Sequence, residues 1–562
     1  MAQTTKLWQL ATSDSTHALP HHIPEALAHV LSSRLIDTRA KLQALLEPPQ
    51  TLPYNPLRLT DMDLALQRLY ETVNRGEKVG IFGDFDVDGI TGTAIIAEGL
   101  EGMGVPVEPY LPHRVGEGHG LSNDAIKHLS ANGSTLIITV DCGVTSAAEV
   151  SYARNMGIDV IITDHHTPPV NPPEATAIIN PRMPGNEYPF LDLCGAGLAF
   201  KLVQGLYQYH GQLWNRNLLE LAALGTIADL VPLVDENRYL VQQGLVELAK
   251  TKRPGLKALY QRAGVNREGI NTETASFQIT PRLNSPGRMS HAIDSYKLLT
   301  TTSDDEAEDL AERLETLNQD RRNLTERAFS VALDKMPAQD HLPSIVVMED
   351  GSFTPGISGL IAGRLSEMYH RPAVVMADIG DGYVTASGRS IPEFNLVEAF
   401  TACEPMFLRY GGHSQAAGFT LLRDKIPELT DKLGTIAEEM LESVELRPIL
   451  GIDAEVNLSE ITEDFLLWLA ALEPFGVANR QPVFLTRNVG ITDTRYMGNL
   501  GQHLRLRVRQ GNVAWTAVAF NQADKWSDGM EAVDIVYTLS SDYWRGEKRV
   551  NLKLLDFRPA EN

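Results

Sequence analysis

Three carboxylates stand close together in the segment 78–94, KVGIFGDFDVDGITGTA. Asp84, Asp86 and Asp88 alternate along the chain, so on an extended backbone they would share one face and repel one another. Between Lys78 and Arg114 the sequence has no lysine or arginine that could neutralise them. Because carboxylate oxygens are preferred ligands of hard cations, this spacing indicates a divalent metal site.

A calcium loop and a solvated acidic turn are the alternatives for these acids. The spacing D-x-D-x-D-G does match the start of an EF-hand loop. The glutamate that closes such a loop would fall at Ile95, however, and residues 79–82 read as a strand where an EF-hand has a helix. The EF-hand interpretation is therefore disfavoured.

Similar acidic stops recur further along the chain. Four apolar runs separated by helical segments each end in a polar residue: 79–82 before Asp84, 136–140 before Asp141, 160–162 before Asp164 and 177–179 before Asn180. This pattern predicts parallel strands of a doubly wound α/β sheet, which binds ligands outside the carboxyl ends of its strands.

Two histidines and a further acid join this set. A histidine pair after a strand is more often structural, but His165 and His166 follow the same kind of run as the acids, and Asp229 follows a helical segment. Carboxylates mixed with imidazole, without cysteine, favour Mn²⁺ or Mg²⁺ over structural zinc. So many carboxylates suggest two ions that share one bridging ligand.

The fold class expected for the whole chain is α/β, with two α/β lobes joined by a long helix and followed by an OB-like β-barrel. Thr60 is expected to cap the first helix before the sheet. Later elements are expected as a long helix at 304–336, strands at 345–348, 373–376 and 383–386, a glycine-rich loop YGGHSQAAGF and a closing helix at 426–440.

The composition is that of a globular protein in a reducing compartment. The chain has 562 residues, of which 43% are hydrophobic, and its three cysteines are too widely spaced for a disulfide framework or a cysteine zinc site. Since no signal peptide or membrane-spanning run is evident, we expect a cytoplasmic protein. A net charge of −23 argues against a polyanionic partner, except that the segment 495–562 has more basic than acidic residues.

The motifs GDFDVDG, VDCG, DHH, GTIADLVPL and YGGHSQAAGF, in this order, resemble the DHH phosphoesterase superfamily with its DHH-associated (DHHA1-type) domain. The segments PRLNSPGRM, LNQDRR and EPFGVANRQPVF narrow the resemblance to bacterial exonucleases specific for single-stranded DNA. It implies five parts: an N-terminal helical segment at 1–60, a DHH catalytic domain at 61–245, a helical connector at 246–338, a DHHA1-type domain at 339–447 and an OB-fold nucleic-acid-binding domain at 448–562.

The resemblance also implies the roles of the metal ligands. One ion would be held by Asp84, Asp86 and Asp141, and the other by Asp88, Asp141, His165 and Asp229, with Asp141 bridging the two. His166 would face the reacting phosphate, so that Asp141, His165 and His166 are the expected catalytic residues.

Substrate contacts are implied as well. A 5′-phosphate pocket would be formed by Arg114, Ser387 and Arg389, although by themselves these residues read as a surface ion pair and a turn. Other positions match residues near the nucleic-acid path of the family: Asn284, Arg288, Gln319, Arg364, Gly411, Gly412 and His413.

The segment HLRLRVRQ near the C-terminus alternates strictly between apolar and basic residues. Arg505, Arg507 and Arg509 would share one face of a strand, which a solvated strand explains equally well in isolation. Trp526, Tyr543 and Trp544 are available for base stacking, and together these residues favour an oligonucleotide-binding barrel.

Three positions depart from the usual pattern of the family. His119 stands where tyrosine is common, Ser285 where alanine is usual, and Phe353-Thr354 where Trp-His precedes a glycine. None of them is an expected metal ligand. The last change removes a nucleic-acid contact expected in the second lobe, so substrate affinity or preferred strand length is expected to differ.

The function implied by the resemblance is a 5′ to 3′ exonuclease that releases 5′-mononucleotides from single-stranded DNA by two-metal hydrolysis, in DNA repair and recombination. Implied protein partners are a single-strand-binding protein and a RecQ-type helicase, with no membrane. One alternative is a DHH phosphoesterase acting on short oligonucleotides or cyclic dinucleotides, which lacks a basic barrel. Another is a non-catalytic scaffold that binds single-stranded DNA, and the intact acids argue against it.

Overall fold

The chain forms two compact units, one comprising Leu52–Leu446 and the other Met1–Thr51 together with Arg447–Asn562. The structure, a computed structural model, describes residues 6–12, 19–20, 22–47, 52–114, 116–338, 341–527, 529–544 and 547–560, without the side chains of 541–548. Every helix in these ranges is too short or too polar to cross a lipid bilayer.

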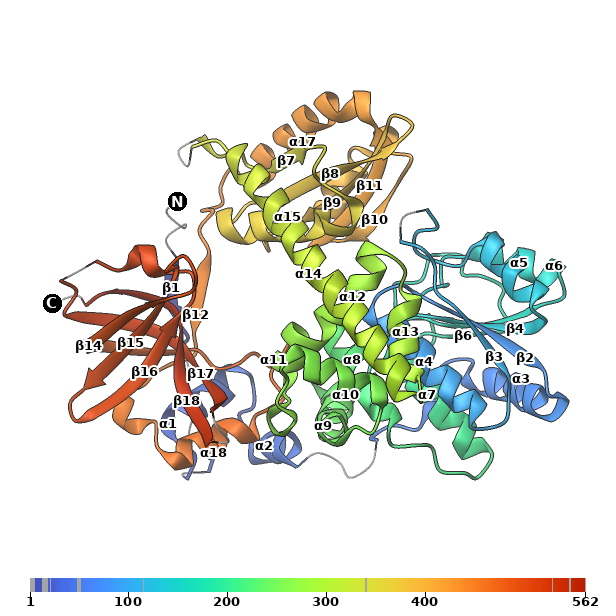
Figure 1. Ribbon diagram of the computed structural model, residues 1–562, viewed down its shortest axis with the longest axis horizontal. Coiled ribbons are helices and arrows are strands. Elements are labelled where there is room, and N and C mark those ends of the chain that lie inside the picture. Colours follow the sequence, from blue (N-terminus) through green and yellow to red (C-terminus); the bar gives the residue numbers. More distant parts are fainter. Residues whose placement is uncertain are drawn as a thin grey trace. The chain divides into compact units, whose positions relative to one another are not determined.

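The unit Leu52–Leu446 begins with a five-stranded sheet in the order β3-β2-β4-β5-β6 (Figure 1). Its strands are β2 (Lys78–Gly83), β3 (Val107–Tyr110), β4 (Ser134–Val140), β5 (Asp159–Thr163) and β6 (Ala177–Ile179). All neighbouring strands run parallel, which confirms the predicted doubly wound sheet. Strand β3 was not predicted, because VEPY is short, only partly buried and contains a proline, as edge strands do.

Helices cover both faces of this sheet. On one face pack α3 (Met62–Arg75), α4 (Val87–Glu101) and α7 (Gly195–Tyr209), and on the other α5 (Asn123–Ala131) and α6 (Ala147–Asn155). The pleat of the strands divides the two cores: in β4, Leu136, Ile138 and Val140 belong to the first and Ile137 to the second. Burial on both faces explains why these strands are continuous apolar runs.

The predicted cap of α3 is wrong. The N-cap of this helix is Asp61, at φ 57° and without a capping side-chain hydrogen bond. The Thr60 hydroxyl donates instead to Asn186 Oδ1 at 3.3 Å. A partner 126 residues away therefore outcompetes the local cap.

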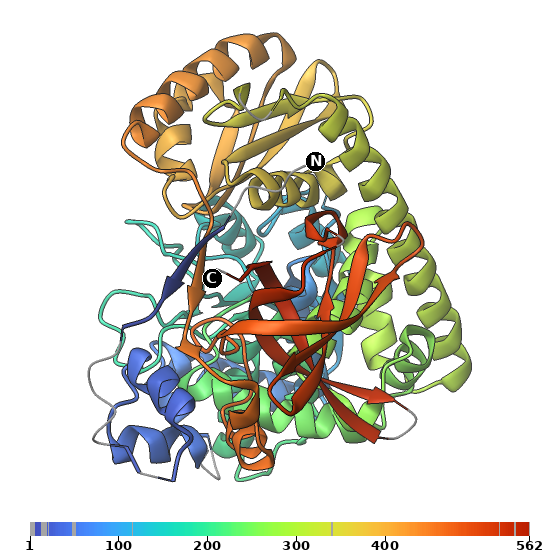
Figure 2. The ribbon, with the colours of Figure 1, turned by 90° about the vertical axis from the view of Figure 1, so that its left-hand side faces the viewer.

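Helices lead from the sheet to a second lobe: α8 (Leu218–Ala228), α9 (Asp235–Lys250), α10 (Pro254–Ala263), α12 (Thr280–Met289), α13 (Ile293–Thr300) and α14 (Asp304–Asp334). The 31-residue α14 confirms the predicted long helix, and Figure 2 shows it as one continuous element. Leu310 and Leu314 pack in the core of the first lobe, whereas Phe329 packs in a core of the second lobe. The helix thus joins the two lobes.

The second lobe contains a five-stranded sheet in the order β10-β11-β9-β8-β7. Its strands are β7 (Val346–Glu349), β8 (Ala373–Gly380), β9 (Tyr383–Arg389), β10 (Arg409–His413) and β11 (Ala416–Leu422), and its helices are α15 (Pro355–Tyr369), α16 (Leu396–Thr401) and α17 (Ile426–Leu441). The predicted loop YGGHSQAAGF is instead part of an antiparallel hairpin. Glycine content disguised these strands, since glycine has low strand propensity.

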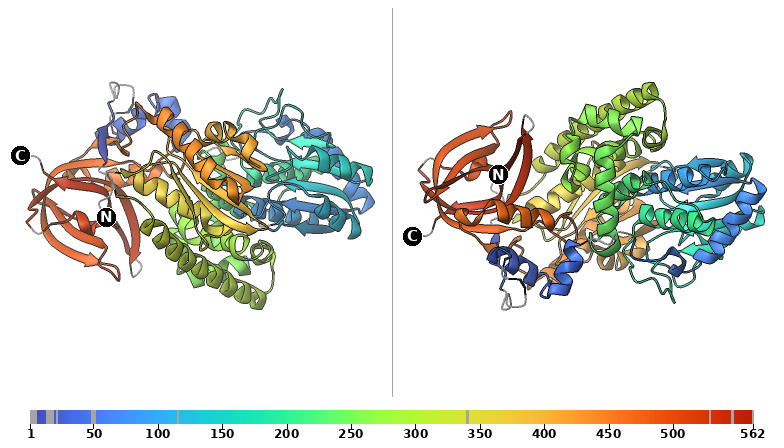
Figure 3. Two further views of the ribbon diagram at one scale, coloured as in Figure 1. Left: turned by 90° about the horizontal axis from the view of Figure 1, so that it is seen from above. Right: turned by 90° about the horizontal axis from the view of Figure 1, so that it is seen from below.

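The other unit contains a closed barrel of β14 (Phe484–Met497), β15 (His503–Gln510), β16 (Val513–Ala519), β17 (Ala532–Trp544) and β18 (Glu547–Pro559). Neighbours pair along the order β14-β15-β16-β18-β17, and the additional pairing of β14 with β17 closes the ring. Figure 3 shows these curved strands in orange and red from two directions. The predicted OB-like barrel is confirmed.

The N-terminal residues complete this same unit. Strand β1 (Leu7–Leu10) pairs in parallel with β12 (Ile449–Ile452). The helices α1 (Glu25–Ser33), α2 (Arg39–Leu46) and α18 (Glu463–Ala471) contribute Leu31, Leu42 and Phe465 to the core of the barrel. The division of the chain into five parts stays a prediction.

Candidate active site

The three alternating acids lie where β2 ends and α4 begins. Asp86 is the N-cap of α4, and its Oδ1 accepts the backbone N–H groups of Asp88 at 2.9 Å and Gly89 at 3.3 Å. A side chain at position 89 is excluded, because a Cβ there would lie 2.4 Å from the Asp84 carbonyl oxygen. The sharp turn therefore needs this glycine, and it turns the acids toward the carboxyl edge of the sheet.

Asp88 is also held by the N-terminus of another helix. Its two carboxylate oxygens accept the backbone N–H groups of Gly195 at 2.6 Å and Ala196 at 2.8 Å, at the start of α7. These two amides were not foreseen as part of the site. A helix N-terminus favours a negative charge, so α7 stabilises Asp88 as an anion.

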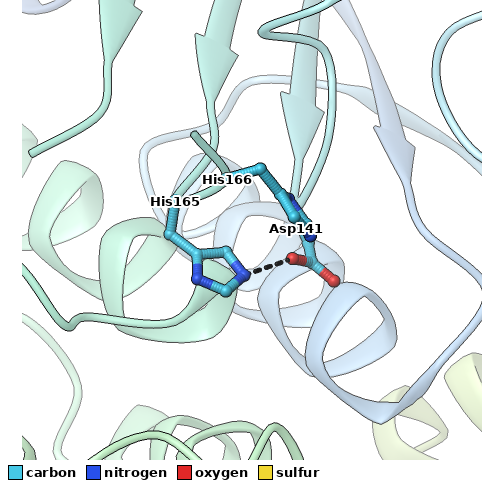
Figure 4. Close-up of side chains that lie close together, drawn as sticks. All are labelled: Asp141, His165 and His166. Carbon is cyan, nitrogen blue, oxygen red and sulfur yellow. Dashed lines mark hydrogen bonds and ion pairs between the residues drawn. The ribbon is translucent and has the colours of Figure 1, made fainter. Parts of the chain in front are cut away.

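Asp141 and His165 extend the group from the neighbouring strands β4 and β5. Asp141 follows β4 at φ 61°, and its backbone N–H donates to the Thr163 carbonyl at 3.0 Å. His165 Nε2 lies 3.0 Å from Asp141 Oδ1, and Figure 4 shows the imidazole directed at this carboxylate. The same nitrogen lies 3.6 Å from Asp229 Oδ2 and 4.0 Å from Asp88 Oδ2.

The side chains fall into three overlapping groups whose potential ligand atoms lie within 4.8 Å of one another: Asp84 with Asp86 and Asp141; Asp88 with His165 and Asp229; and Asp141 with His165 and His166. The predicted acids and histidines thus converge, although they span residues 84 to 229 of the sequence. Asp141 belongs to the first and third of these groups, and His165 links the third group to the second.

The electrostatics of the group favour a cation. Burial raises the pKa values of Asp86, Asp88 and Asp141, and in each case a neighbouring carboxylate adds to the increase. Burial and then the Asp88 charge raise the pKa of Asp229 to about 9. Among the described residues, buried Asp84 Oδ1 and Asp229 Oδ2 find no hydrogen-bond partner. A metal ion would supply both the missing partner and the missing positive charge.

Asp164 has a different role from the other acids. Its Oδ1 accepts His166 Nδ1 at 2.8 Å, and its Oδ2 accepts the backbone N–H of Val144 at 2.9 Å. The hydrogen bond to Asp164 raises the pKa of His166 to about 9, against the opposing effect of burial. This raised pKa favours the protonated form of His166 at neutral pH, beside Asp141 and His165.

Four arginines form a cluster, and Arg114 brings it near these acids. Arg114 stacks on the Phe85 ring, with 3.9 Å from Cζ to the ring centroid, and donates to the Gly287 carbonyl at 3.2 Å. Burial, followed by the positive charges of Arg114, Arg321 and Arg389, lowers the pKa of Arg288 to about 9. Several cations held close together make a site for an anion, and arginine suits phosphate.

Arg389 and Ser387 bring the second lobe into this cluster. Both are on β9, and Arg389 Nη1 donates to the Gly388 carbonyl at 2.8 Å. A Cβ at Gly359 of α15 would lie 3.1 Å from Arg389 Nη2 and 3.6 Å from the Ser387 Cβ. Position 359 therefore lies against both predicted phosphate-binding side chains.

The other predicted nucleic-acid contacts differ in their surroundings. Asn284 Oδ1 accepts the Val87 N–H at 3.2 Å, which secures the start of α4. Gln319 is exposed and donates to Asn323 Oδ1 at 2.9 Å. Arg364 forms an ion pair with Glu326 at 2.8 Å and stacks on Phe329. Asn284 and Arg364 thus already have structural partners.

The hairpin of β10 and β11 carries Gly411, Gly412 and His413. At Gly412, with φ 137°, a Cβ would lie 2.4 Å from the Ala416 carbonyl oxygen, so the close pairing needs glycine. Burial and then the charges of Arg389 and His166 lower the pKa of His413. His413 therefore lies near both the arginine cluster and the acidic group.

The barrel shows the predicted alternation on β15. Arg505, Arg507 and Arg509 are exposed, whereas Leu504, Leu506 and Val508 are buried. Arg495 of the neighbouring strand β14 lies opposite Arg505 in the strand register and adds a further basic residue. Trp526 and Arg509 line one pocket, together with Asp493 and Met530. The side chains of Tyr543 and Trp544 lie outside the described residues.

The three cysteines are free and buried: Cys142, Cys194 and Cys403. Cys194 is the N-cap of α7, and its Sγ accepts the Gly197 N–H at 3.4 Å.

His119 was not expected at the acidic group, yet its Nδ1 lies 3.2 Å from Asp84 Oδ2. Its substitution for tyrosine was the one sign of this in the sequence.

The stability of the metal-free protein is expected to depend on Asp229. Its pKa rises from an ordinary 3.8 to about 9 on folding, so the stability it contributes is lost as pH rises from about 4 to 9. We expect Asp229→Asn to raise the unfolding free energy in chelator at pH 8 by at least about 1.4 kcal/mol, and less at pH 5. Thermal or urea unfolding at both values checks this, with exposed Asp124→Asn as control. An equal effect at both pH values would contradict it.

Comparison with known proteins agrees with this geometry. The DHH family, N-terminal domain, matches residues 78–226, the DHHA1 domain matches 342–439 and the RecJ OB domain matches 452–556. The fold and the acidic site therefore define a DHH-class protein with a DHHA1 domain. Two relatives bear the name single-stranded-DNA-specific exonuclease RecJ. The one from Bacillus subtilis is 34% identical over 96% of this chain and 69% of its own length. The one from Salmonella typhimurium is 32% identical over 97% of this chain and 98% of its own length. The chain belongs to the RecJ family.

Solved structures extend the similarity to three dimensions. The crystal structure of RecJ from Thermus thermophilus in complex with Mn²⁺ superposes with a TM-score of 0.83 at 28% identity, over 99% of this chain and 80% of that chain. The Mg²⁺ complex of the same protein gives a TM-score of 0.77 at 27% identity, over 99% of this chain and 79% of that one. The resemblance inferred from the motifs is confirmed.

Proposed function

We propose that this protein is a metal-dependent 5′ to 3′ exonuclease that releases 5′-mononucleotides from single-stranded DNA, in DNA repair and recombination. The observation that carries the proposal is the position of Asp141, which belongs both to a group with Asp84 and Asp86 and to a group with His165. The charges of Asp84 and Asp86 act on the pKa of Arg114, so the arginine cluster lies near these groups. Relatives that bear the name of this exonuclease support the proposal.

The donor set fits two divalent cations of the hard type. We assign Asp84, Asp86 and Asp141 to one ion and Asp88, Asp141, His165 and Asp229 to the other, with Mn²⁺ or Mg²⁺ as the metal. The buried carboxylate oxygens without partners support this assignment, as do the metal-bound structures of RecJ from T. thermophilus. When bound, such a pair lowers the pKa of a water molecule and polarises the phosphoryl oxygens.

The protein side chains position the substrate around this centre. Protonated His166, oriented by Asp164, places a positive charge and an N–H donor toward the reacting phosphate. Arg114, Ser387 and Arg389 bind the 5′-terminal phosphate, supported by Arg288, whose charge acts on the same cluster. An end-binding pocket near the metal centre limits each cut to the first phosphodiester bond, which yields mononucleotides.

The proposal is tested by product analysis of end-labelled single-stranded DNA. We expect 5′-mononucleotides from the 5′ end with Mn²⁺ or Mg²⁺ and none with a chelator. A dinucleotide and a cyclic dinucleotide serve as comparison substrates. Cleavage from the 3′ end, or hydrolysis of the dinucleotides alone, would overturn the proposal.

We further propose that the exposed arginines of β15 bind the DNA backbone. The double variant Arg505→Ala, Arg507→Ala is expected to weaken binding of all sequences alike, and to reduce the slope of log K against log salt by about 0.7 per arginine. Titration of labelled oligonucleotides at several salt concentrations checks this. Arg487→Ala is the control, because that arginine is engaged with Glu455 at 3.1 Å. An unchanged slope would place the DNA elsewhere.

Cytoplasmic location stays a prediction, as does association with a single-strand-binding protein and a RecQ-type helicase. Retention of enzyme on DNA coated with single-strand-binding protein, compared with bare DNA, tests the first of these associations.

A further inference from the structure

His119 brings a third imidazole to the acids, beside Asp84. Its Nδ1 lies 3.2 Å from Asp84 Oδ2. In the sequence His119 comes before Asp141, whereas His165 comes after it. The Asp84 side chain is 5% exposed and that of His119 is 72% exposed, so a buried carboxylate meets a ring that reaches in from the surface. None of the roles assigned so far uses this nitrogen.

The ring is held in place by its neighbours. His119 packs on Phe85 at 4.4 Å between ring centroids and 50° between planes. Phe85 stands between Asp84 and Asp86 in the sequence and also carries the Arg114 guanidinium on its ring. The segment that contains Arg114 and His119 therefore contacts the Phe85 ring through both of these side chains.

The spacing is that of two ligands of one ion. Bonds of about 2.1 Å to a six-coordinate cation place adjacent ligand atoms about 3.0 Å apart. His165 Nε2 and Asp141 Oδ1 are separated by 3.0 Å, and His119 Nδ1 and Asp84 Oδ2 by 3.2 Å. His119 Nδ1 thus lies at ligand spacing from Asp84 Oδ2, as His165 Nε2 does from Asp141 Oδ1.

We infer that His119 is a ligand of the ion held by Asp84, Asp86 and Asp141, and that it shifts the preference of this position from Mg²⁺ toward Mn²⁺. The inference rests on the metal centre assigned under the proposed function. Carboxylates alone suit both ions, whereas imidazole suits transition metals better than Mg²⁺. An exposed ligand on a surface segment also suits an ion that exchanges with solvent.

A simple hydrogen bond from His119 to Asp84 is the competing interpretation. It would orient the carboxylate and alter the affinity for both ions to a similar extent. A direct ligand, by contrast, transfers electron spin from Mn²⁺ to nitrogen. Pulsed EPR of the Mn²⁺-loaded protein therefore separates the two interpretations without any measurement of activity.

The variant His119→Phe keeps an aromatic ring on Phe85 and removes both nitrogens. His113→Phe is the matched control, since it makes the same change in the same segment, where the ring of His113 contacts that of His291. Calorimetric titration with Mn²⁺ and with Mg²⁺ accompanies the EPR measurement. Unfolding curves of both variants establish that the fold is kept, and His119→Ala serves as a second variant.

We expect His119→Phe to lose one of the ¹⁴N couplings seen in the wild type. One of the two Mn²⁺ ions should bind roughly 10-fold less tightly to this variant, and the loss of affinity for Mg²⁺ should be smaller. His113→Phe is expected to match the wild type. Unchanged ¹⁴N couplings in His119→Phe, or equal losses for both ions, would overturn the inference. If the wild type itself bound no Mn²⁺, the proposed metal centre would fail instead, and the two failures are thereby distinguished.

Discussion

Asp141→Asn is expected to lower the rate of single-stranded DNA hydrolysis roughly 10³-fold or more while DNA binding is retained. Asp141 is the acid common to the group with Asp84 and the group with His165, so neutralising it weakens both proposed metal positions at once. Asparagine is the appropriate replacement because residue 141 has φ 61°, which asparagine tolerates better than alanine does.

Single-turnover hydrolysis and oligonucleotide binding, measured on the same preparations, check this expectation. Asp124→Asn is the matched control, because Asp124 is an exposed acid on α5 whose partner is Lys127. Hydrolysis by Asp141→Asn within 10-fold of the wild type would show that this residue does not bridge two ions. Parallel loss of DNA binding would indicate a disrupted fold rather than a disrupted centre.

Arg389→Ala is expected to remove most of the preference for a 5′-phosphorylated end. A charge-assisted hydrogen bond to phosphate contributes about 1.5 to 3 kcal/mol, so the ratio of kcat/KM for phosphorylated over hydroxyl ends should fall roughly 10- to 100-fold. Arg389→Lys keeps the charge but loses the planar fork of donors, and an intermediate ratio is expected.

The two substrates should differ only in the terminal phosphate. Arg423→Ala is the control in the same lobe, since Arg423 is engaged with Asp378 at 2.9 Å and with Glu349. If Arg389→Ala slowed both substrates equally, the residue would position the DNA backbone and the 5′-phosphate would bind elsewhere.

Local patterns predicted much of the first lobe. The apolar runs of β2, β4, β5 and β6 and the acids after them were identified because strands buried on both faces are continuous apolar segments with polar ends. The strands β10 and β11 were not identified, although they pair as a local hairpin, because their glycines have low strand propensity, and the edge strand β3 was missed because it is short, partly buried and contains a proline.

The same contrast holds for individual site residues. Asp88, His165 and Asp229 were predicted from their types and from the family motifs. The amides of Gly195 and Ala196 on Asp88, the hydrogen bond from Val87 of α4 to Asn284 and the approach of His119 to Asp84 were not. Backbone amides are present at almost every position, so the sequence does not mark those that bind a carboxylate. The sequence also does not show whether a loop side chain faces solvent or a site.

The sequence by itself determined which residues are chemically able to hold cations, and that parallel strands would carry them to one edge of a sheet. The tertiary structure alone decided that Asp141 is shared between two groups, that arginines from two lobes gather beside them, and that the N-terminal strand pairs with β12 next to the barrel. Strand periodicity and side-chain chemistry are local properties that composition and spacing express directly. Distances between residues more than a hundred positions apart depend on how helices and sheets pack, and short sequence patterns do not encode that packing.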